Sequence, residues 1–338
     1  MNGNALLLTG VYRSGTTLLS CMLGSHPDIN FSYGMVNYLR WYVKRNVDPK
    51  NYKFIVADVS SRLLKRFNKE LNSDKIINNL SQNSNINHAE IFYEIMSEFY
   101  SNKSTYWGEK TLLEWSNSTI FLSMFSNAKV IHIVRDPRDV LASFKEMTFE
   151  PGNRYLDAIF AAKHSMNTAV RFKAQLNENS YLVVKYEDLI LKPENELKNI
   201  CDFLKLKYNH SMLNEDLYLD QLGNKFKKTA HSSYGANKKL FGRWKEKLNQ
   251  SEKDLTESLI YEEMEHFGYS VDPQNSKRIR ECLNLISSEP LLQQRFITFM
   301  QTGNGVEEYP SDPLREENWT VINEGNAVSA KKMYLKNK

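Results

Sequence analysis

The segment Gly10-Val11-Tyr12-Arg13-Ser14-Gly15-Thr16-Thr17 decides how this chain folds. It follows a short apolar run, Ala5–Thr9, which is typical of a buried strand. It leads into Gly15–Leu23, where apolar residues have helical spacing. A glycine-bearing loop that enters a helix turns backbone N–H groups toward one point, and the helix dipole adds positive charge there. The segment therefore predicts an anion-binding loop at the start of an α/β fold.

This loop differs from the nucleoside-triphosphate P-loop, GxxxxGK[ST], at one informative position. Gly10, Gly15 and the Thr17 hydroxyl fit that motif. Thr16 replaces the lysine that reaches the β- and γ-phosphates, and the cation lies inside the loop at Arg13. This favours a single 5′-phosphate carrying a small anionic group, with Arg13 stabilising charge on the bridging oxygen. A polar turn with a surface arginine is the alternative interpretation.

A second loop, Arg135–Asp139, follows the apolar run Val130–Val134 and precedes a helix predicted over 138–147. Arg135 ends the predicted strand, where its side chain would point into the crevice beyond the sheet. Ser143 lies eight residues on, about two helical turns away. Both side chains can reach one phosphate if the helix packs back across the strand end. A capping network of Arg135 or Arg138 with Asp139 is an equally good reading of these residues alone.

The strand–loop–helix pattern occurs a third time, at Tyr181–Lys185 with a helix over Glu194–Leu204. The repetition predicts a P-loop-like three-layer α/β sandwich, with a mainly parallel central sheet flanked by helices. Ligands of such sheets bind beyond the carboxyl ends of the strands. We expect one domain over residues 1–270 and a C-terminal extension over 271–338. The remaining expectations are a linker over Asn72–His88, helices over Asn153–Asn177 and Ser251–His266, and a mobile loop over Lys225–Lys239.

The composition is that of an ordinary soluble protein and excludes some classes. Hydrophobic residues make up 41% of the 338 residues and charged residues 25%. The net charge of +4 is too small to predict nucleic-acid binding. Neither the three cysteines nor the seven histidines have metal-ligand spacing, so no metal is expected. No apolar run is long enough for a transmembrane segment and no signal peptide is visible, which favours a cytoplasmic protein.

Five elements in order along the chain resemble the sulfotransferase family, which uses 3′-phosphoadenosine-5′-phosphosulfate (PAPS). The first loop resembles the tyrosylprotein and bacterial branches of that family most. The resemblance covers about residues 5–270. Its elements are Gly10–Thr17, Gly108-Glu109-Lys110-Thr111, Arg135 through Ser143, Lys185-Tyr186-Glu187-Asp188-Leu189 and Phe241-Gly242-Arg243-Trp244-Lys245.

The resemblance implies a role for each matching residue. The 5′-phosphosulfate would be held by Arg13, Ser14, Gly15, Thr16 and Thr17. The 3′-phosphate would be held by Arg135 and Ser143, with Lys238, Lys239 and Arg243 closing over it. Tyr186 would contact the adenine, and Lys110 would stabilise the sulfuryl group during transfer. Tyr186, Lys238 and Lys239 also fit plain structural roles, in the core or as solvated charges.

The family pattern breaks at the general base. Cytosolic members have a histidine directly after the Lys-Thr pair, where this chain has Leu112. The tyrosylprotein branch has a glutamate shortly after the His-Pro-Asp segment, where this chain has Tyr33 and Gly34. Four residues remain as candidates: Glu109, Glu114, Asp58 and His231. Glu109 is preferred because the adjacent Lys110 would keep it ionised, although an exposed structural carboxylate would look the same.

The predicted function is transfer of a sulfuryl group from PAPS to a hydroxyl or amine acceptor, which releases adenosine 3′,5′-bisphosphate (PAP). A P-loop kinase or NTPase and a catalytically silent PAPS- or PAP-binding protein are the alternatives. The acceptor could be a carbohydrate, a phenol, a lipid or a peptide. Four aromatic residues either line the acceptor pocket or belong to the core: Tyr33, Tyr38, Trp41 and Tyr42. The C-terminal tail, with Trp319 and four glutamates, either covers the acceptor site or supports a homo-oligomer.

Overall fold

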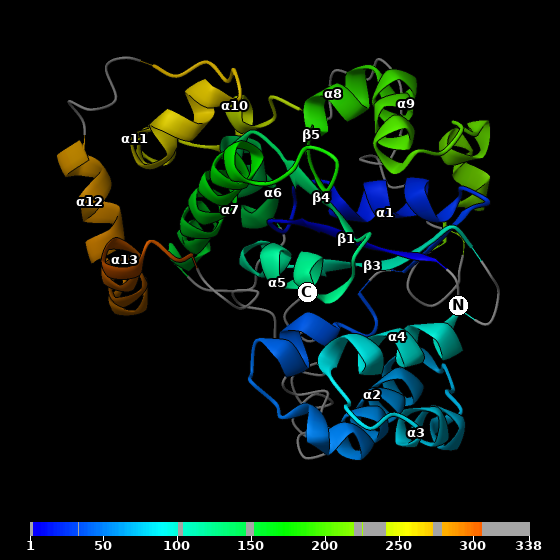
Figure 1. Ribbon diagram of the computed structural model, residues 1–338. Coiled ribbons are helices and arrows are strands. Elements are labelled where there is room, and N and C mark those ends of the chain that lie inside the picture. The colour runs from blue at the N-terminus through cyan, green and yellow to red at the C-terminus, as the bar shows by residue number, and fades with distance from the viewer. Residues whose placement is uncertain are drawn as a thin grey trace.

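The structure, a computed structural model, describes residues 3–32, 34–100, 104–146, 152–219, 225, 241–272 and 279–305 (Figure 1). Several predictions from the sequence lie outside these residues. They concern Tyr33, His231, Lys238, Lys239 and the acidic tail with Trp319.

A five-stranded sheet of order β2-β3-β1-β4-β5 forms the centre of the molecule, and all neighbouring strands are parallel. In the register of the sheet, Leu8 of β1 lies between Lys110 of β3 and Ile131 of β4. The loops that follow β1, β3 and β4 therefore leave the same edge of the sheet, and the predicted fold class is confirmed. The strands are β1 (Asn4–Gly10), β2 (Ile29–Ser32), β3 (Tyr106–Leu112), β4 (Lys129–Val134) and β5 (Tyr181–Lys185).

One face of the sheet is covered by α1, α8 and α9 (Figure 1). Side chains alternate along β1, so Leu6 and Leu8 pack into this cluster and are fully buried. Cys21 and Cys201 lie in the same cluster as free, buried thiols. The bounds are α1 (Thr16–Gly24), α8 (Tyr186–Leu191) and α9 (Pro193–Leu204).

The opposite side carries the cluster that Ala5 and Leu7 enter, built with α2, α3, α4 and α5. The prediction of a linker over Asn72–His88 is wrong, because this stretch contains α3. The Asn72 side chain accepts a hydrogen bond from the Lys75 N–H and caps that helix, while Ile76 and Leu80 are buried against its neighbours. The bounds are α2 (Tyr52–Phe67), α3 (Ser73–Ser81), α4 (His88–Phe99) and α5 (Ser118–Met124).

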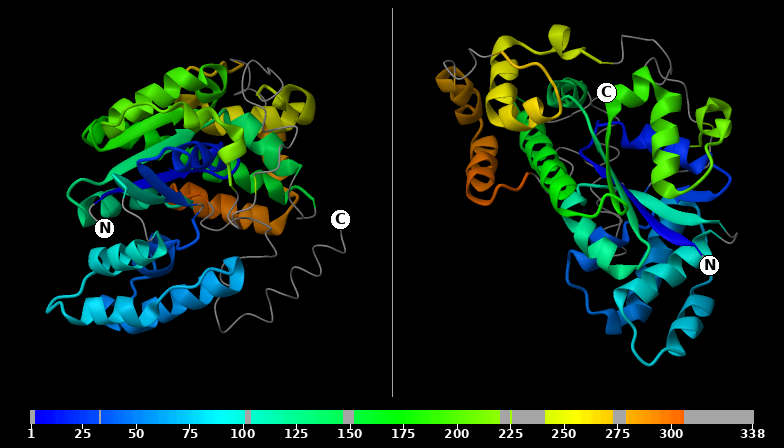
Figure 2. Two further views of the ribbon diagram at one scale, coloured as in Figure 1. Left: turned by 90° about the vertical axis from the view of Figure 1, so that its right-hand side faces the viewer. Right: turned by 45° about the horizontal axis from the view of Figure 1, so that its top comes forward.

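A third cluster joins α6 and α7 to the helices that follow. Helices α12 and α13, orange in Figure 2, lie beside α11 and α7. Phe299 of α13 stacks on Phe160 of α7 with ring centroids 5.1 Å apart. These two helices therefore pack on the same body as the sheet, while a separate role for residues 271–338 stays a prediction. The bounds are α6 (Pro137–Lys145), α7 (Asp157–Gln175), α10 (Trp244–Lys247), α11 (Gln250–His266), α12 (Ile279–Ser287) and α13 (Pro290–Thr302).

None of the helices in the described part of the chain combines the length and the apolar character that a membrane span requires.

His132 of β4 gives the folded protein a testable pH dependence. Its ring is fully buried, and its two nitrogens lie 2.6 Å from the Tyr181 hydroxyl and 2.9 Å from the Ser165 hydroxyl. Burial, with a smaller contribution from His164, lowers the pKa of His132 to about 3. An unfolded histidine has a pKa of about 6.5, so between these values only the unfolded chain binds the proton.

We therefore predict that His132 lowers the free energy of unfolding as the pH falls from about 6.5 toward 3, by about 1.4 kcal/mol per pH unit. Denaturant unfolding of the wild type and of His132→Leu across this range measures the effect. The free energy of unfolding of the wild type should fall relative to that of His132→Leu as the pH falls. The same substitution at the exposed His210 is the control, and a pH-independent difference at position 132 would contradict the prediction.

Candidate functional site

The loop between β1 and α1 is closed by its own serine. Ser14 donates its hydroxyl to the Val11 carbonyl over 2.6 Å and its N–H to the same carbonyl over 3.2 Å. Gly15 precedes the first turn of α1 in the left-handed region, at φ 100°, and offers no side-chain acceptor to the N–H groups of that turn. Helix N-termini without such a cap are suited to bind an anion. The loop therefore has the form that the sequence predicts.

Tyr186, at the start of α8, covers this loop. Its ring lies directly against Gly15, where an added methyl group would be 2.2 Å from a ring carbon. The Arg135 guanidinium also contacts Tyr186 and lies 4.4 Å from the centre of its ring. Burial raises the pKa of the Tyr186 phenol, and the nearby Arg135 opposes that shift. Gly15 and Arg135 therefore both contact the Tyr186 ring, and all three residues are predicted to bind the nucleotide.

Two hydrogen bonds join the first loop to the second loop and to the α6 helix that follows it. Arg135 donates from Nη1 to the Arg13 carbonyl over 2.9 Å. Arg13 in turn donates from Nε to the Ser143 hydroxyl of α6, also over 2.9 Å. Arg135 and Ser143 are 8% and 6% exposed, so these bonds lie in a largely dehydrated place. The structure therefore brings residues predicted to bind the 5′-phosphosulfate into contact with residues predicted to bind the 3′-phosphate.

Lys110 joins this cluster from β3. Its Nζ lies 3.3 Å from the Thr17 hydroxyl, to which it donates. The parallel register explains the contact, because Lys110 is paired with Leu8 near the end of β1, just before the loop. An ammonium group at the start of α1 is placed to stabilise negative charge on a group bound by the loop.

The Glu109 side chain points away from that of Lys110, because neighbouring side chains along a strand lie on opposite faces of the sheet. Its carboxylate is 1% exposed and accepts the N–H groups of Val36, Asn37 and Tyr38 over 3.0–3.2 Å. Burial raises its pKa to about 7, although the three N–H groups oppose the shift. These contacts make Glu109 a positioning group for the segment beside Lys110, and its role as general base stays a prediction.

The other described candidates for the base are held in networks of their own. Asp58 accepts hydrogen bonds from the Tyr42 hydroxyl over 2.5 Å and from Arg62 over 3.2 Å. Glu114 is buried, accepts the side-chain amide of Asn117 over 2.6 Å and lies 3.9 Å from the Lys44 ammonium. Neither carboxylate is therefore assigned as the base by its contacts.

Three of the aromatics considered for the acceptor pocket belong to the core. Tyr38, Trp41 and Tyr42 are at most 4% exposed. Tyr38 stacks on Phe92 of α4 with ring centroids 4.7 Å apart. The open choice between pocket and core is thus decided for these residues in favour of the core.

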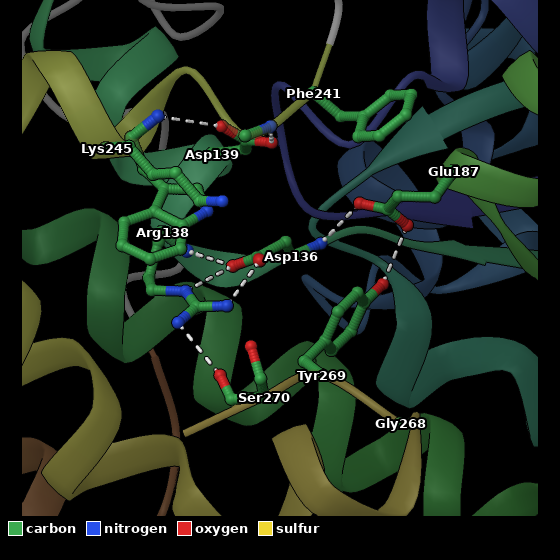
Figure 3. Close-up of a pocket in the computed structure, with 11 residues that line it drawn as sticks. Asp136, Arg138, Asp139, Glu187, Phe241, Lys245, Gly268, Tyr269 and Ser270 are labelled. Atoms are coloured by element: carbon green, nitrogen blue, oxygen red, sulfur yellow. Dashed lines mark hydrogen bonds and ion pairs between the residues drawn. The ribbon is translucent and has the colours of Figure 1, made fainter. Parts of the chain in front are cut away.

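A small cavity of about 250 Å³ lies beside the second loop (Figure 3). On one of its walls, Glu187 accepts the Asp136 N–H over 2.9 Å and the Tyr269 hydroxyl over 2.8 Å. Burial raises the pKa of Glu187, while the Asp136 N–H and Tyr269 oppose the shift. Tyr269 follows α11 and was not found from the sequence, because a single tyrosine after a helix carries no distinctive signal. Through Glu187, Tyr269 connects the segment after α11 to the second loop.

Arg138 is the other anchor of the second loop. It forms ion pairs of 2.7 Å with both Asp136 and Glu257 of α11, and its guanidinium lies 3.8 Å from the centre of the Trp244 ring. An arginine–aspartate network therefore exists in this loop, but Arg138 builds it with Asp136 and not with the expected Asp139. The Arg135 guanidinium lies 3.9 Å from the Asp139 carboxylate.

The Gly-Arg-Trp element is attached to the same loop. Asp139 accepts the N–H groups of Gly242 and Trp244 over 2.7 Å and 3.1 Å. Arg243, predicted to close over the 3′-phosphate, instead pairs with Glu146 over 2.6 Å. Its proposed nucleotide contact stays a prediction.

The contact between Gly15 and Tyr186 gives a test of the site's geometry. Gly15→Ala should destabilise the fold by about 1–3 kcal/mol, because the methyl group meets the ring and position 15 has a positive φ. The same change in a Tyr186→Ala background should cost less, since the ring is gone. Thermal unfolding of the four proteins measures the coupling. Equal costs in both backgrounds would show that the ring does not lie on Gly15.

Comparison with known proteins bears on the family and the fold of this chain. Residues 5–210 match the family described as "Sulfotransferase family". The human protein named "Protein-tyrosine sulfotransferase 1" is 25% identical over 225 residues, which cover 64% of this chain and 55% of the relative. The Drosophila melanogaster protein named "Protein-tyrosine sulfotransferase" is 24% identical over 221 residues, which cover 64% of this chain and 41% of the relative. The chain thus matches about half the length of these two relatives.

A solved structure, the sulfotransferase domain of the Synechococcus PCC 7002 olefin synthase, superposes with a TM-score of 0.55. The superposition covers 80% of this chain and 97% of that domain at 21% identity, and it shows the shared fold. Because the family match extends over more than half of the chain, from β1 through α9, this chain belongs to the sulfotransferase family.

Proposed function

We propose that this protein binds PAPS and transfers its sulfuryl group to a hydroxyl or amine acceptor, releasing PAP. The observation that carries the proposal is the meeting of the two loops, with Arg13, Arg135 and Ser143 in direct contact and Lys110 beside Thr17. PAPS has two separate anionic ends, a 5′-phosphosulfate and a 3′-phosphate. A site with two adjoining anion-binding loops is complementary to such a molecule.

The first loop supplies the chemistry of transfer. Backbone N–H groups at the start of α1 would hold the 5′-phosphate, and the S–O bond to that phosphate would break as the acceptor oxygen or nitrogen attacks sulfur. The Lys110 ammonium is placed to stabilise the negative charge that develops on the sulfuryl and bridging oxygens. The adenine would contact Tyr186, whose ring is already fixed between Gly15 and Arg135.

Transfer to the acceptor also requires a base that removes its proton. The described candidates, Glu109, Glu114 and Asp58, are each engaged by other groups. Glu109 has a pKa of about 7, which suits proton transfer near neutral pH, but its oxygens are engaged by three N–H groups. We therefore propose Glu109 as the residue that fixes the segment 34–38 beside Lys110.

Calorimetric titration with PAP, and with ATP in the presence of Mg²⁺, tests the proposal. PAP should bind with one site per chain and more tightly than ATP. Arg135→Ala should weaken PAP binding roughly 10- to 100-fold, because it removes charge-assisted hydrogen bonds from a site that is mostly buried. The exposed Arg171 on α7 provides the matched control, and Arg171→Ala should bind PAP as the wild type does.

Three outcomes separate the proposal from its alternatives. Absent PAP binding, or tighter binding of Mg²⁺-ATP, would contradict it and return the chain to the kinases and NTPases. PAP binding without release of PAP from PAPS, across carbohydrate, phenol, lipid and peptide acceptors, would favour a catalytically silent binding protein. PAP release that depends on an acceptor would support the full proposal.

A further inference from the structure

Segment 34–38, which follows β2, has a backbone shape that depends on its surroundings. Gly34 and Asn37 both lie in the left-handed region, with φ of 68° and 49°. A Cβ atom at position 34 would be 2.2 Å from the Lys110 carbonyl oxygen, so the segment lies directly against the strand that carries Lys110. Two left-handed residues within four positions persist only where neighbouring groups hold them. The groups that hold this segment therefore also shape the surroundings of Lys110.

Two buried side chains of opposite charge hold the main chain at Val36. Glu109 is 1% exposed and accepts the Val36 N–H over 3.2 Å, together with the N–H groups of the next two residues. Arg62 of α2 is 4% exposed and donates from Nη2 to the Val36 carbonyl over 3.1 Å. We call this pair the Glu109–Arg62 clamp. Its two charges fix both the N–H and the C=O of one residue, and therefore the orientation of the peptide groups on either side of Val36.

Arg62 also connects the clamp to the turn that follows the segment. Its Nη2 donates to the Tyr42 hydroxyl over 2.9 Å, and its guanidinium lies 5.2 Å from the centre of the Trp41 ring. The Trp41 N–H donates to the Asn37 carbonyl over 3.1 Å, and the Asn37 N–H donates to Glu109 over 3.0 Å. Trp41 is therefore connected to both halves of the clamp, through Asn37 and through Arg62.

We propose that the Glu109–Arg62 clamp holds segment 34–38 against the Lys110 strand only while Glu109 is ionised, so that this side of the site becomes ordered as the pH rises. In the structure both carboxylate oxygens accept N–H groups, Oε2 from two residues of the segment and Oε1 from a third. A proton on either oxygen would face an N–H donor, so a neutral Glu109 cannot keep all three hydrogen bonds. Arg62 is then a positioning residue, which acts on the surroundings of Lys110 through the segment. Its effect on sulfuryl transfer rests on the proposed function.

The charges around Glu109 bring its titration into the neutral range. Burial raises the pKa of Glu109 to about 7, and the three N–H groups together with the Arg62 guanidinium oppose that shift. Asp58 pairs with Arg62 over 3.2 Å. Loss of the Arg62 charge should therefore raise the pKa of Glu109 further, which moves the loss of the clamp to a higher pH.

The other titratable groups around the segment change charge in other pH ranges. Lys110 lies on the opposite face of the strand. Burial raises the pKa of the phenols of Tyr38, Tyr42 and Tyr100, so all three stay neutral. His88 lies 2.9 Å from the Tyr38 hydroxyl, and burial lowers its pKa below the ordinary histidine value. A transition of this segment at about pH 7 is therefore assigned to Glu109.

Tryptophan fluorescence of the full chain across the neutral pH range tests the inference, with Trp41 as the reporter. The signal of Trp41 is the difference between each protein and its Trp41→Phe counterpart. The wild type should show a transition at about pH 7, and Glu109→Gln should show none, because an amide does not titrate. Arg62→Met should move the transition up by about one pH unit or more, whereas Arg62→Lys, which keeps the charge, should move it less. Lys53→Met, at an exposed position of α2, is the control that should leave it unchanged.

Binding and turnover separate this inference from the proposed function. Arg62→Met should bind PAP within about threefold of the wild type, because Arg62 contacts Val36, Tyr42 and Asp58 rather than the nucleotide loops. With PAPS and whichever acceptor of the carbohydrate, phenol, lipid and peptide panel releases PAP, this variant should lower kcat roughly tenfold and leave KM for PAPS unchanged. Arg62→Lys should recover part of that loss.

A fluorescence transition that persists in Glu109→Gln, or that Arg62→Met leaves in place, would overturn the inference. If Arg62→Met fails to fold, the comparison of the wild type with Glu109→Gln decides alone. A wild type that binds no PAP would instead contradict the proposed function, and the fluorescence result would still decide the inference.

Discussion

The candidate site depends on the parallel pairing of β1 with β4, which brings the loops that follow these two strands to one edge of the sheet. The hydrogen bond from Arg135 to the Arg13 carbonyl then fixes the distance between them. Because this bond joins a side chain to the main chain, it sets the position of the loop itself. Three further contacts are made to residues of the same loop. The Tyr186 ring contacts Gly15, Ser143 accepts from Arg13, and Lys110 donates to Thr17.

Charged side chains away from the nucleotide residues hold the second loop in place. On one side, Glu187 accepts the Asp136 N–H and the Tyr269 hydroxyl, and on the other side Arg138 pairs with the Asp136 carboxylate. Glu257 of α11 extends this network beyond the residues that match the family. Buried ion pairs of this kind add little net stability, but removal of one partner leaves a costly unpaired charge. Their main effect here is therefore to fix geometry.

The fold class, and the two loops that the structure brings together, could be predicted from the sequence because both rest on local patterns. An apolar strand, a glycine loop and a helix are visible in Ala5–Leu23, and the second loop repeats that pattern. Strand β3 was missed because Gly108-Glu109-Lys110-Thr111 is not an apolar run, even though the strand is largely buried. Helix α3 was missed because its capping asparagine and its polar face read as a linker. The roles of Glu109 and Tyr269 depend on contacts between distant segments, which no local pattern reports.

A crystal structure with PAP bound would test the central claim, that the loops after β1 and β4 form one site, most directly. The account predicts the 5′-phosphate on the N–H groups of residues 14–17 and the 3′-phosphate in contact with Arg135 and Ser143. It also predicts the Tyr186 ring against the adenine. A PAP molecule bound elsewhere, or one whose 3′-phosphate does not touch the second loop, would contradict the account.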